Sequence, residues 1–292
     1  MKGIIQSLTR RCWLAGIAYS MAALAQSDEG RKAALLRLVH EADAFAAKAP
    51  GILGKETLEQ TTLDITRFMA GRRGDEAWPP IFKRTIVSDY GFLRLGPQEV
   101  REIRQVLTVD GKPPKRKAKA LDSIAQATQT SDKERQKILE SLERHGLRGV
   151  ATDFGPVILI FASGHSDRFE ILFNRIDTMD GEQMWAFKFA QVDGPGGMTI
   201  FERGRPIKQK LTGEIWFRAS DYLPRRIILN STHEGVKGEK LRDLSYIEYK
   251  MTDFGAILPA RVVHQAFVGE RVDVQDLFTY SDYREVAPVA QK

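Results

Sequence analysis

The feature that most constrains the fold is a series of strand-length segments with alternating polarity, which follows Gly146 and continues almost to the C-terminus. In Trp185 to Phe189, for example, aromatic residues occupy every second position and so share one face of a strand. Short turn sequences such as Asp180-Gly181 separate these segments, and strands joined in this way pair antiparallel. One large antiparallel sheet, curled or closed, is therefore predicted. Strands are expected at 157–161, 169–173, 184–189, 211–219, 225–233, 241–252, 258–268 and 274–283.

The part of the chain before Gly146 combines helices with further strands. Apolar residues between Ala33 and Phe45 recur at three- and four-residue steps, which indicates a helix that ends at Pro50-Gly51. Alternating patterns then predict three strands, and residues 115–145 contain two helical stretches. The predicted fold class is α+β, a large curved antiparallel sheet with helices covering its concave face. The three strands are expected at 55–65, 82–95 and 100–109.

Residues 1–25 have the pattern of a secretory signal peptide. Lys2, Arg10 and Arg11 precede an apolar run from Cys12 to Leu24, and Ala23-Leu24-Ala25 fits a small-x-small cleavage site. The run is shorter than the roughly 20 apolar residues that a membrane anchor needs. The paired arginines also resemble a twin-arginine signal, so the export route stays open. The mature protein is expected to start just after the cleavage site near Ala25 and to be periplasmic or secreted.

Removal of the leader leaves a chain without cysteine, because Cys12 is the only one in the sequence. No disulfide is therefore expected in the mature protein. The whole chain has a net charge of +6, and three of its positively charged residues belong to the leader. No long tract of the sequence joins Lys or Arg with aromatic residues. Nucleic acid is not an expected partner. Residues 26–287 are predicted to form one domain with a helical insertion at 113–146, and 288–292 a C-terminal tail.

Patterns that would indicate catalysis or a cofactor are missing from the sequence. The chain has no GxGxxG, P-loop, GxSxG or HExxH pattern, and its five histidines show no paired ligand spacing. We therefore expect no enzyme activity, no cofactor and no metal site. Ser163 to Asp167 and Ser281 carry hydrolytic residue types, but a polar turn and a paired strand explain them better. A hydrolase built on either segment is the less favoured alternative.

Apolar residues occur on both faces of the expected sheet. Met184 and Ala186 alternate with the aromatic residues of their strand, and Ile228, Ile247 and Tyr249 also lie opposite apolar runs. A sheet with one solvated face would carry polar residues at those positions. Both faces are therefore expected to be covered, by helices, by closure of the sheet or by a bound apolar ligand. Ordinary core packing is the alternative that needs no ligand.

Three segments of the chain carry a family resemblance: Gly213 to Arg226 reads GEIWFRASDYLPRR, Gln183 to Phe189 reads QMWAFKF, and Phe278 to Tyr283 reads FTYSDY. Together they resemble the LolA-like superfamily of periplasmic lipoprotein carriers. The phrase GEIWFRASDYLPRR, Gly213 to Arg226, is similar to the family's G-x-(I/L)-W strand, short turn and Pro-Arg-hydrophobic strand. Gln183 to Phe189 resembles a strand of its long antiparallel run, and Phe278 to Tyr283 its closing strand. The resemblance implies an unclosed half-barrel around a hydrophobic groove, with helices as a lid. It also implies a non-enzymatic role in carrying or sensing acyl chains, lipids or lipoproteins, although the longer first half and the basic stretch 112–119 depart from the family.

The predicted function is binding of an apolar ligand, such as a lipid, an acyl chain or a lipoprotein, in a groove of the sheet. Period-two alternation places two sets of side chains toward the concave interior. An envelope interaction or structural module with a fully packed core is the main alternative, with an envelope protein as its partner. A basic cluster offers contact with a membrane surface, although a solvated helix face also explains it. The predicted groove residues are Trp185, Phe187, Phe189, Ile215 and Phe217, and the basic cluster is Lys112, Lys115, Arg116, Lys117 and Lys119.

Overall fold

One antiparallel sheet forms most of the computed structural model, which describes residues 28–63, 81–94, 100–114, 147, 153–192, 198–202, 205–234, 238 and 240–286. The strands lie in the order β3-β2-β1-β11-β10-β9-β8-β7-β5-β4, and β6 pairs with β7 outside this path. Pairing of β1 with β11 joins the first and the last described strands of the chain. The strands are β1 Ile52–Leu63, β2 Ile81–Arg94, β3 Val100–Val109, β4 Phe169–Met179, β5 Glu182–Gln191, β6 Met198–Glu202, β7 Arg205–Arg218, β8 Pro224–Glu234, β9 Lys240–Met251, β10 Ile257–Val268 and β11 Arg271–Glu285.

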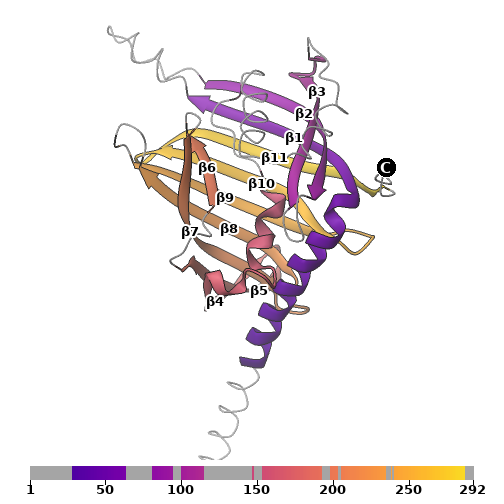
Figure 1. The fold of residues 1–292 in the computed structure, drawn as a ribbon, viewed down its shortest axis with the longest axis vertical. Coiled ribbons are helices and arrows are strands. Elements are labelled where there is room, and N and C mark those ends of the chain that lie inside the picture. The colour runs from indigo at the N-terminus through magenta and orange to yellow at the C-terminus, as the bar shows by residue number, and fades with distance from the viewer. Residues whose placement is uncertain are drawn as a thin grey trace, which may run out of the picture.

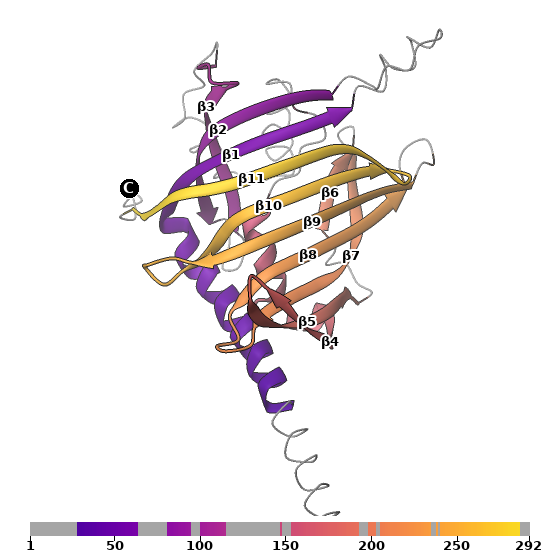
Figure 2. The same ribbon diagram turned by 180° about the vertical axis from the view of Figure 1, so that it is seen from behind.

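The described sheet is strongly curved and not closed, with β3 and β4 at its two edges (Figures 1 and 2). A 3-10 helix, Gly155–Phe161, contacts strands from both ends of this sheet. The Gly155 N–H donates a hydrogen bond of 2.8 Å to Glu102 of β3, and the Phe161 ring lies 5.8 Å from that of Phe169 in β4. The two edges therefore bend toward the same segment. We call the side of the sheet that faces this segment the inner face.

Period-two alternation decides which side chains reach the inner face. In β1 the buried positions are the even ones from 52 to 62, and in β11 they are the even ones from 274 to 280. The main apolar core draws on all ten strands of the main path and on a helix over residues 28–48. The inner face therefore holds the principal core of the described part of the chain.

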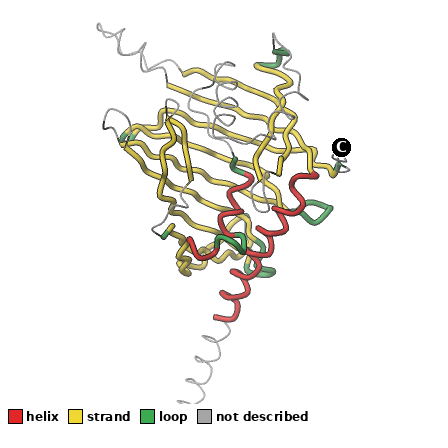
Figure 3. Tube along the Cα trace, viewed as in Figure 1, coloured by secondary structure: helices red, strands yellow, loops and turns green. Residues whose placement is uncertain are grey.

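Helix 28–48 crosses in front of the sheet (Figure 3). One stripe of its surface packs against the inner face. The Phe45 ring meets Phe92 of β2 edge-on, with ring centroids 5.2 Å apart. The sequence therefore predicted this helix correctly, because its apolar spacing matches the stripe that becomes buried. The fully buried residues of the stripe include Ala34, Leu38, Ala42 and Phe45.

Hydrogen bonds hold the C-terminal end of helix 28–48. The Arg94 guanidinium donates to the carbonyls of Ala46 and Ala47, at 2.6 and 2.9 Å, and so satisfies acceptors that a helix end leaves open. Lys48 Nζ donates to the Gly255 carbonyl at 2.7 Å. A short 3-10 turn, Ala49–Gly51, then leads into β1.

The expected strand at 157–161 is wrong, because this run belongs to the 3-10 helix Gly155–Phe161. Pro156 lies in the first turn, where its fixed φ suits a helical backbone and its missing N–H is not needed. Every residue of the segment except Ile160 is buried. A continuous apolar run fits a helical segment buried on all sides as well as a buried strand, so hydrophobicity alone could not separate the two.

The other expected strands are present, with ends that differ by a few residues, and β6 is an additional strand. The expected turn at Asp180-Gly181 joins β4 to β5, with φ of 54° and 79° that asparagine, aspartate and glycine tolerate best. The leader 1–25, the tail 288–292 and the insertion 113–146, except residues 113 and 114, lie outside the described residues. The domain boundaries therefore stay predictions. Within the described residues, none of the helices has the length and apolar character required to span a bilayer.

Candidate functional site

The five side chains predicted to line a groove all lie on the inner face. Trp185, Phe187 and Phe189 alternate along β5, and the strand pairs with β7 so that Trp185 lies opposite Phe217 and Phe187 opposite Ile215. Four of the five are at most 2% exposed, and Trp185 is half-buried. The fold therefore gathers these residues in one patch, and their contact with a ligand stays a prediction.

Edge-to-face ring contacts connect the patch. The Phe187 ring lies 5.3 Å from Phe217 and 5.4 Å from Phe173 of β4, with interplanar angles of 83° in both pairs. Phe189 meets Phe161 of the 3-10 helix at 5.1 Å. Such pairs stabilise beyond the area that they bury. We call this surface the aromatic wall, and it consists of Phe173, Trp185, Phe187, Phe189, Ile215 and Phe217.

The first turns of helix 28–48 lie against the aromatic wall. A Cβ on Gly30 would come within 2.4 Å of Trp185 Cη2, so glycine allows the helix to approach the indole. The Arg31 guanidinium lies 4.2 Å from the centroid of the Phe173 ring, in cation–π geometry. Tyr222 packs against Trp185 at 5.4 Å between ring centroids. In this structure the helix therefore occupies the surface that a ligand on the wall would need.

A row of polar side chains also lies on the inner face, and the sequence analysis did not identify it. Gln60, Asp276, His264 and Ser245 come from β1, β11, β10 and β9, and each lies directly opposite the next in the strand ladder. All four are at most 4% exposed. The sequence could have indicated them, because each lies an even number of positions from buried apolar residues of its own strand, as Gln60 does from Leu58. We call these four residues the polar row.

Hydrogen bonds join the polar row in two pairs. The Gln60 amide donates to Asp276 Oδ1 at 2.8 Å. Ser245 Oγ lies 3.0 Å from His264 Nδ1, and Asp243 Oδ1 lies 3.8 Å from His264 Nε2. Asp276 Oδ2 is buried and has no hydrogen-bond partner among the described residues. One buried oxygen of the row therefore has no hydrogen bond within the described part of the chain.

Burial favours the uncharged forms of both titratable side chains in the row. Desolvation raises the pKa of Asp276 to about 7, while the Gln60 hydrogen bond lowers it and the nearby Glu56 charge raises it. Desolvation lowers the pKa of His264, against the attraction of Asp243. The Asp276 carboxyl is therefore neutral in weakly acidic solution.

Asp276→Asn is expected to change how stability depends on pH. The folded-state pKa of Asp276 is raised above that of an unfolded aspartate, so the wild type loses stability from this group as pH rises from about 4 to about 8. Asparagine does not titrate, so the variant does not lose this stability. The free energy of unfolding of the variant minus that of the wild type should therefore increase by as much as about 4 kcal/mol as pH rises over that range. Urea unfolding of both proteins at a series of pH values measures the difference. A difference that does not change with pH would contradict the burial of this carboxyl.

A buried ion-pair network fixes the start of the 3-10 helix to the sheet. Arg104 of β3 donates to both oxygens of Glu56 at 2.7 Å and to Glu102 at 2.6 Å. Glu102 also accepts hydrogen bonds from the backbone N–H groups of Asp153 and Gly155, at 2.7 and 2.8 Å. Desolvation lowers the pKa of Arg104, but the two carboxylates raise it well above its usual value, so the guanidinium stays charged. The network therefore positions the segment that covers this part of the inner face.

The hydrolytic residue types at 163–167 make hydrogen bonds in different directions. Ser163 donates from its backbone N–H and its hydroxyl to Asp43 of helix 28–48, at 3.1 and 3.3 Å. His165 Nδ1 lies 3.0 Å from a backbone carbonyl of the preceding 3-10 helix, and Asp167 is exposed in a short turn. Ser281, the other candidate, is exposed on β11. These contacts agree with the polar turn and the paired strand expected there.

The outer face carries a smaller apolar cluster of its own. The Trp216 indole lies between the guanidinium groups of Arg175 and Arg226, which are 5.2 and 5.5 Å from its ring centroid. Arginine side chains therefore cover this cluster, a type of cover that the sequence analysis did not consider. The cluster consists of Met179, Met184, Ala186, Trp216 and Ile228. Met184, Ala186 and Ile228 were among the residues from which two covered faces were predicted. The other two of those residues, Ile247 and Tyr249, belong to the inner core.

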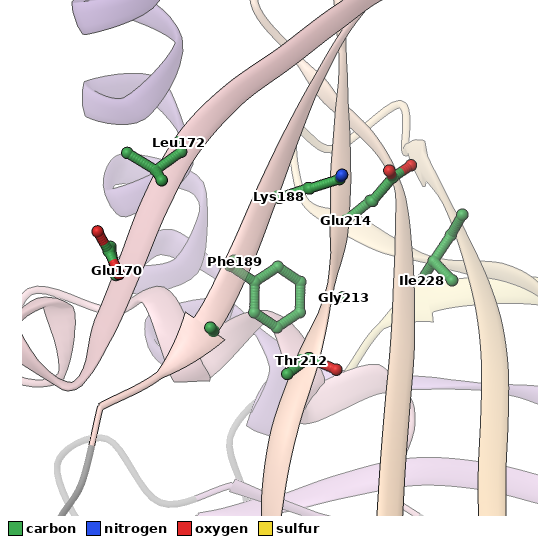
Figure 4. Close-up of a pocket in the computed structure, with 9 residues that line it drawn as sticks. Glu170, Leu172, Lys188, Phe189, Thr212, Gly213, Glu214 and Ile228 are labelled. Carbon is green, nitrogen blue, oxygen red and sulfur yellow. The ribbon is translucent and has the colours of Figure 1, made fainter.

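A pocket of about 410 Å³ lies beside this cluster, across β4, β5, β7 and β8 (Figure 4). Small residues, among them Ala190, Thr212 and Gly213, leave room there, and Lys188 and Glu214 place opposite charges on its rim. Most of its lining consists of outer-face side chains, and Phe189 is the one predicted groove residue that also lines it. Its remaining lining residues are Glu170, Leu172, Phe189 and Ile228.

Two further expectations concern the surface and metals. Of the basic cluster 112–119, the structure describes only Lys112 of the five cations, and it is exposed. The other four lie outside the described residues, so membrane contact through this cluster stays a prediction. Within the part of the chain that the structure describes, no group of His, Cys, Asp or Glu side chains has an arrangement that could hold a metal ion.

No family model and no curated protein sequence matches this chain. Three solved structures are similar to it at 8–12% sequence identity. A DUF1329 family protein from Desulfovibrio piger has a TM-score of 0.38 and 8% identity, covering 86% of this chain and 95% of that one. An outer membrane lipoprotein-sorting protein domain from Vibrio parahaemolyticus has a TM-score of 0.40 and 9% identity, covering 88% and 95%. A LolA superfamily protein from Nitrosomonas europaea has a TM-score of 0.30 and 12% identity, covering 86% of this chain and 93% of that one.

Proposed function

We propose that this chain is an exported, non-enzymatic protein that binds an apolar ligand between helix 28–48 and the aromatic wall. The ligand is a lipid, an acyl chain or the acyl part of a lipoprotein. The observation that supports this most is the wall itself, in which aromatic rings from β4, β5 and β7 form one inner surface against helix 28–48. The leader pattern and the resemblance to LolA-like carriers agree with a periplasmic carrier or sensor.

The two ends of the helix are held in different ways. Hydrogen bonds from Arg94 and Lys48 fix the C-terminal end to the sheet and to the loop between β9 and β10. At the other end, Gly30 and Arg31 contact the rings of the wall. An apolar ligand can replace ring contacts without leaving a buried donor or acceptor unpaired. We therefore expect the N-terminal part of the helix to move aside while its C-terminal end stays hydrogen-bonded to the sheet.

Binding requires that the ligand gains more free energy than the movement of the helix costs. Each buried methylene contributes about 0.8 kcal/mol, so an acyl chain of about twelve methylenes gains roughly 10 kcal/mol before any cost. Opening of the helix and ordering of the chain reduce this gain. A saturable but moderate affinity is the expected result.

An interaction module with a permanently filled inner face is the competing function. Phe187 and Phe217 are almost fully buried and in edge-to-face contact, whereas an empty preformed groove would leave such rings exposed. The two functions differ in whether helix 28–48 gives way to a ligand.

Native mass spectrometry of protein purified from the periplasm without detergent tests the proposal. Adducts with the masses of acyl lipids, which organic extraction removes, are the expected result. Protein refolded from denaturant in lipid-free buffer is the matched control, and it should lack adducts until lipid is added. A clean apo mass, together with no binding of a fluorescent fatty acid, would favour the packed module.

A further inference from the structure

The inner face of β4 and β5 is more exposed at one end than at the other. Along β4 the exposed fraction of the inner-face side chains rises from 9% at Phe169 to 57% at Ile176. Ile176 lies directly opposite Trp185 of β5, which is half-buried, whereas Phe189 at the other end of the wall is 2% exposed. Burial therefore changes in the same direction along both strands. The aromatic wall has an open end at Trp185 and a closed end at Phe189.

Three rings close the wall at the Phe189 end. The Phe161 ring of the 3-10 helix lies 5.1 Å from that of Phe189 and 5.8 Å from that of Phe169, and the last two rings are 5.9 Å apart. All three side chains are at most 9% exposed. Phe169 lies opposite Gln191, the residue that follows Phe189 on this face of β5. Phe161 therefore covers the inner face just where the wall would continue.

Hydrogen bonds fix the cover of the closed end, whereas ring contacts hold the cover of the open end. Glu102 accepts bonds from the backbone at the start of the 3-10 helix. Ser163, two residues after Phe161, donates to Asp43. At the open end, the first turns of helix 28–48 meet the indole of Trp185. A ligand that displaces these turns enters at the Trp185 end and meets a fixed stop at the other.

The distance between the two ends sets the length of chain that the wall can hold. Trp185 and Phe189 are four residues apart on β5, which corresponds to about 14 Å at roughly 3.4 Å per residue. A zigzag of carbon atoms joined by bonds of about 1.5 Å advances roughly 1.3 Å per methylene. An extended chain of about eleven methylenes therefore fills the wall from its open end to its closed end.

We infer that the aromatic wall takes an acyl chain methyl end first through its Trp185 end, and that Phe161 limits the length of this chain to about eleven methylenes. The polar end of the ligand then stays in water at the open end and keeps its hydration. The inference rests on the proposed function, because it needs the acyl chain to occupy the wall. It makes Phe161 a residue that determines specificity for chain length.

Displacement of anilinonaphthalene sulfonate by saturated fatty acids of increasing length tests the inference. From octanoate to dodecanoate the affinity of the wild type is expected to rise at least about tenfold, because each added methylene is buried. Tetradecanoate and hexadecanoate should bind within about twofold of dodecanoate, because their additional methylenes stay in water. Dodecanedioate should bind at least about tenfold more weakly than dodecanoate, because its second carboxylate would be buried against the rings of the closed end.

Two substitutions of Phe161 are expected to shift the length limit. In Phe161→Ala the ring that stops the chain is missing, so tetradecanoate should bind at least about fivefold more tightly than dodecanoate. Phe161→Leu removes less volume and serves if Phe161→Ala does not fold, and its preference for tetradecanoate should be at least about threefold. Ile160→Ala is the matched control, because Ile160 is the half-buried residue of the same 3-10 helix, and it should keep the limit at dodecanoate.

The possible outcomes separate this inference from the proposed function. An affinity that rises at the same rate up to hexadecanoate, or equal affinities for dodecanoate and dodecanedioate, would show that both ends of the wall are open. Either result would overturn the inference and leave apolar binding intact. A limit that neither Phe161 variant changes, or that Ile160→Ala shifts equally, would also overturn it. If the wild type binds none of the fatty acids, the proposed function fails, and the inference fails with it.

Discussion

Arg104→Met is expected to lower the free energy of unfolding by about 3–5 kcal/mol. The Arg104 side chain is 4% exposed and binds Glu56 and Glu102, which are themselves buried. Methionine replaces much of its volume but leaves two carboxylates in the core without a cation. Removal of one partner from a buried network leaves uncompensated charge, which is far more costly than the loss of a surface ion pair. Urea unfolding followed by tryptophan fluorescence measures the effect.

Two further variants control for this prediction. Arg175 also binds a carboxylate, Glu214, at 2.8 Å, but its side chain is 41% exposed, so Arg175→Met should cost less than about 1 kcal/mol. The double variant Arg104→Met/Glu56→Gln should be more stable than Arg104→Met alone, because it removes one uncompensated charge. Similar small losses for Arg104→Met and Arg175→Met would show that the buried network does not hold the inner face together.

Phe217→Ala is expected to cost about 3–5 kcal/mol in stability and to weaken binding of an acyl probe. Phe217 is 0% exposed and packs edge-on against Phe187, so the substitution leaves a cavity in the aromatic wall. Met184→Ala is the matched control, because Met184 is equally buried but lies in the outer-face cluster. It should lower stability by about 2–5 kcal/mol without changing probe affinity. A large stability loss in Phe217→Ala with unchanged affinity would refute the assignment of this residue to the ligand site.

The strands could be predicted from the sequence because alternation is a local signal. Phe187 and Phe189 lie on one face of β5 because they are two positions apart, and Phe217 reaches the same face from β7. The 3-10 helix Gly155–Phe161 could not be predicted in this way, because burial on all sides removes the periodicity on which the prediction depends. The fold class and a curled or closed sheet followed from the strands, and the unclosed half-barrel followed only from the resemblance.

The candidate site was predicted only in its apolar half. The aromatic wall appears in the sequence as two short patterns, whereas the polar row draws one residue from each of four strands. Gln60 and Asp276 are 216 positions apart, and only their pairing in the sheet makes them neighbours. The arginine cover of Trp216 depends on similar long-range contacts, between β4, β7 and β8. Residue type and spacing alone do not contain this information.

The most direct test of the central claim, that an acyl ligand replaces helix 28–48 on the aromatic wall, is a probe titration on two variants with opposite expected effects. Leu38 is almost fully buried in the helix stripe, and Leu38→Ala weakens packing of the helix on the sheet. Apparent affinity rises with the fraction of molecules in the open form. Leu38→Ala should therefore bind an acyl probe more tightly than the wild type, and Phe217→Ala more weakly, although both are less stable. Weaker binding by both variants, or no saturable binding by the wild type, would contradict the claim.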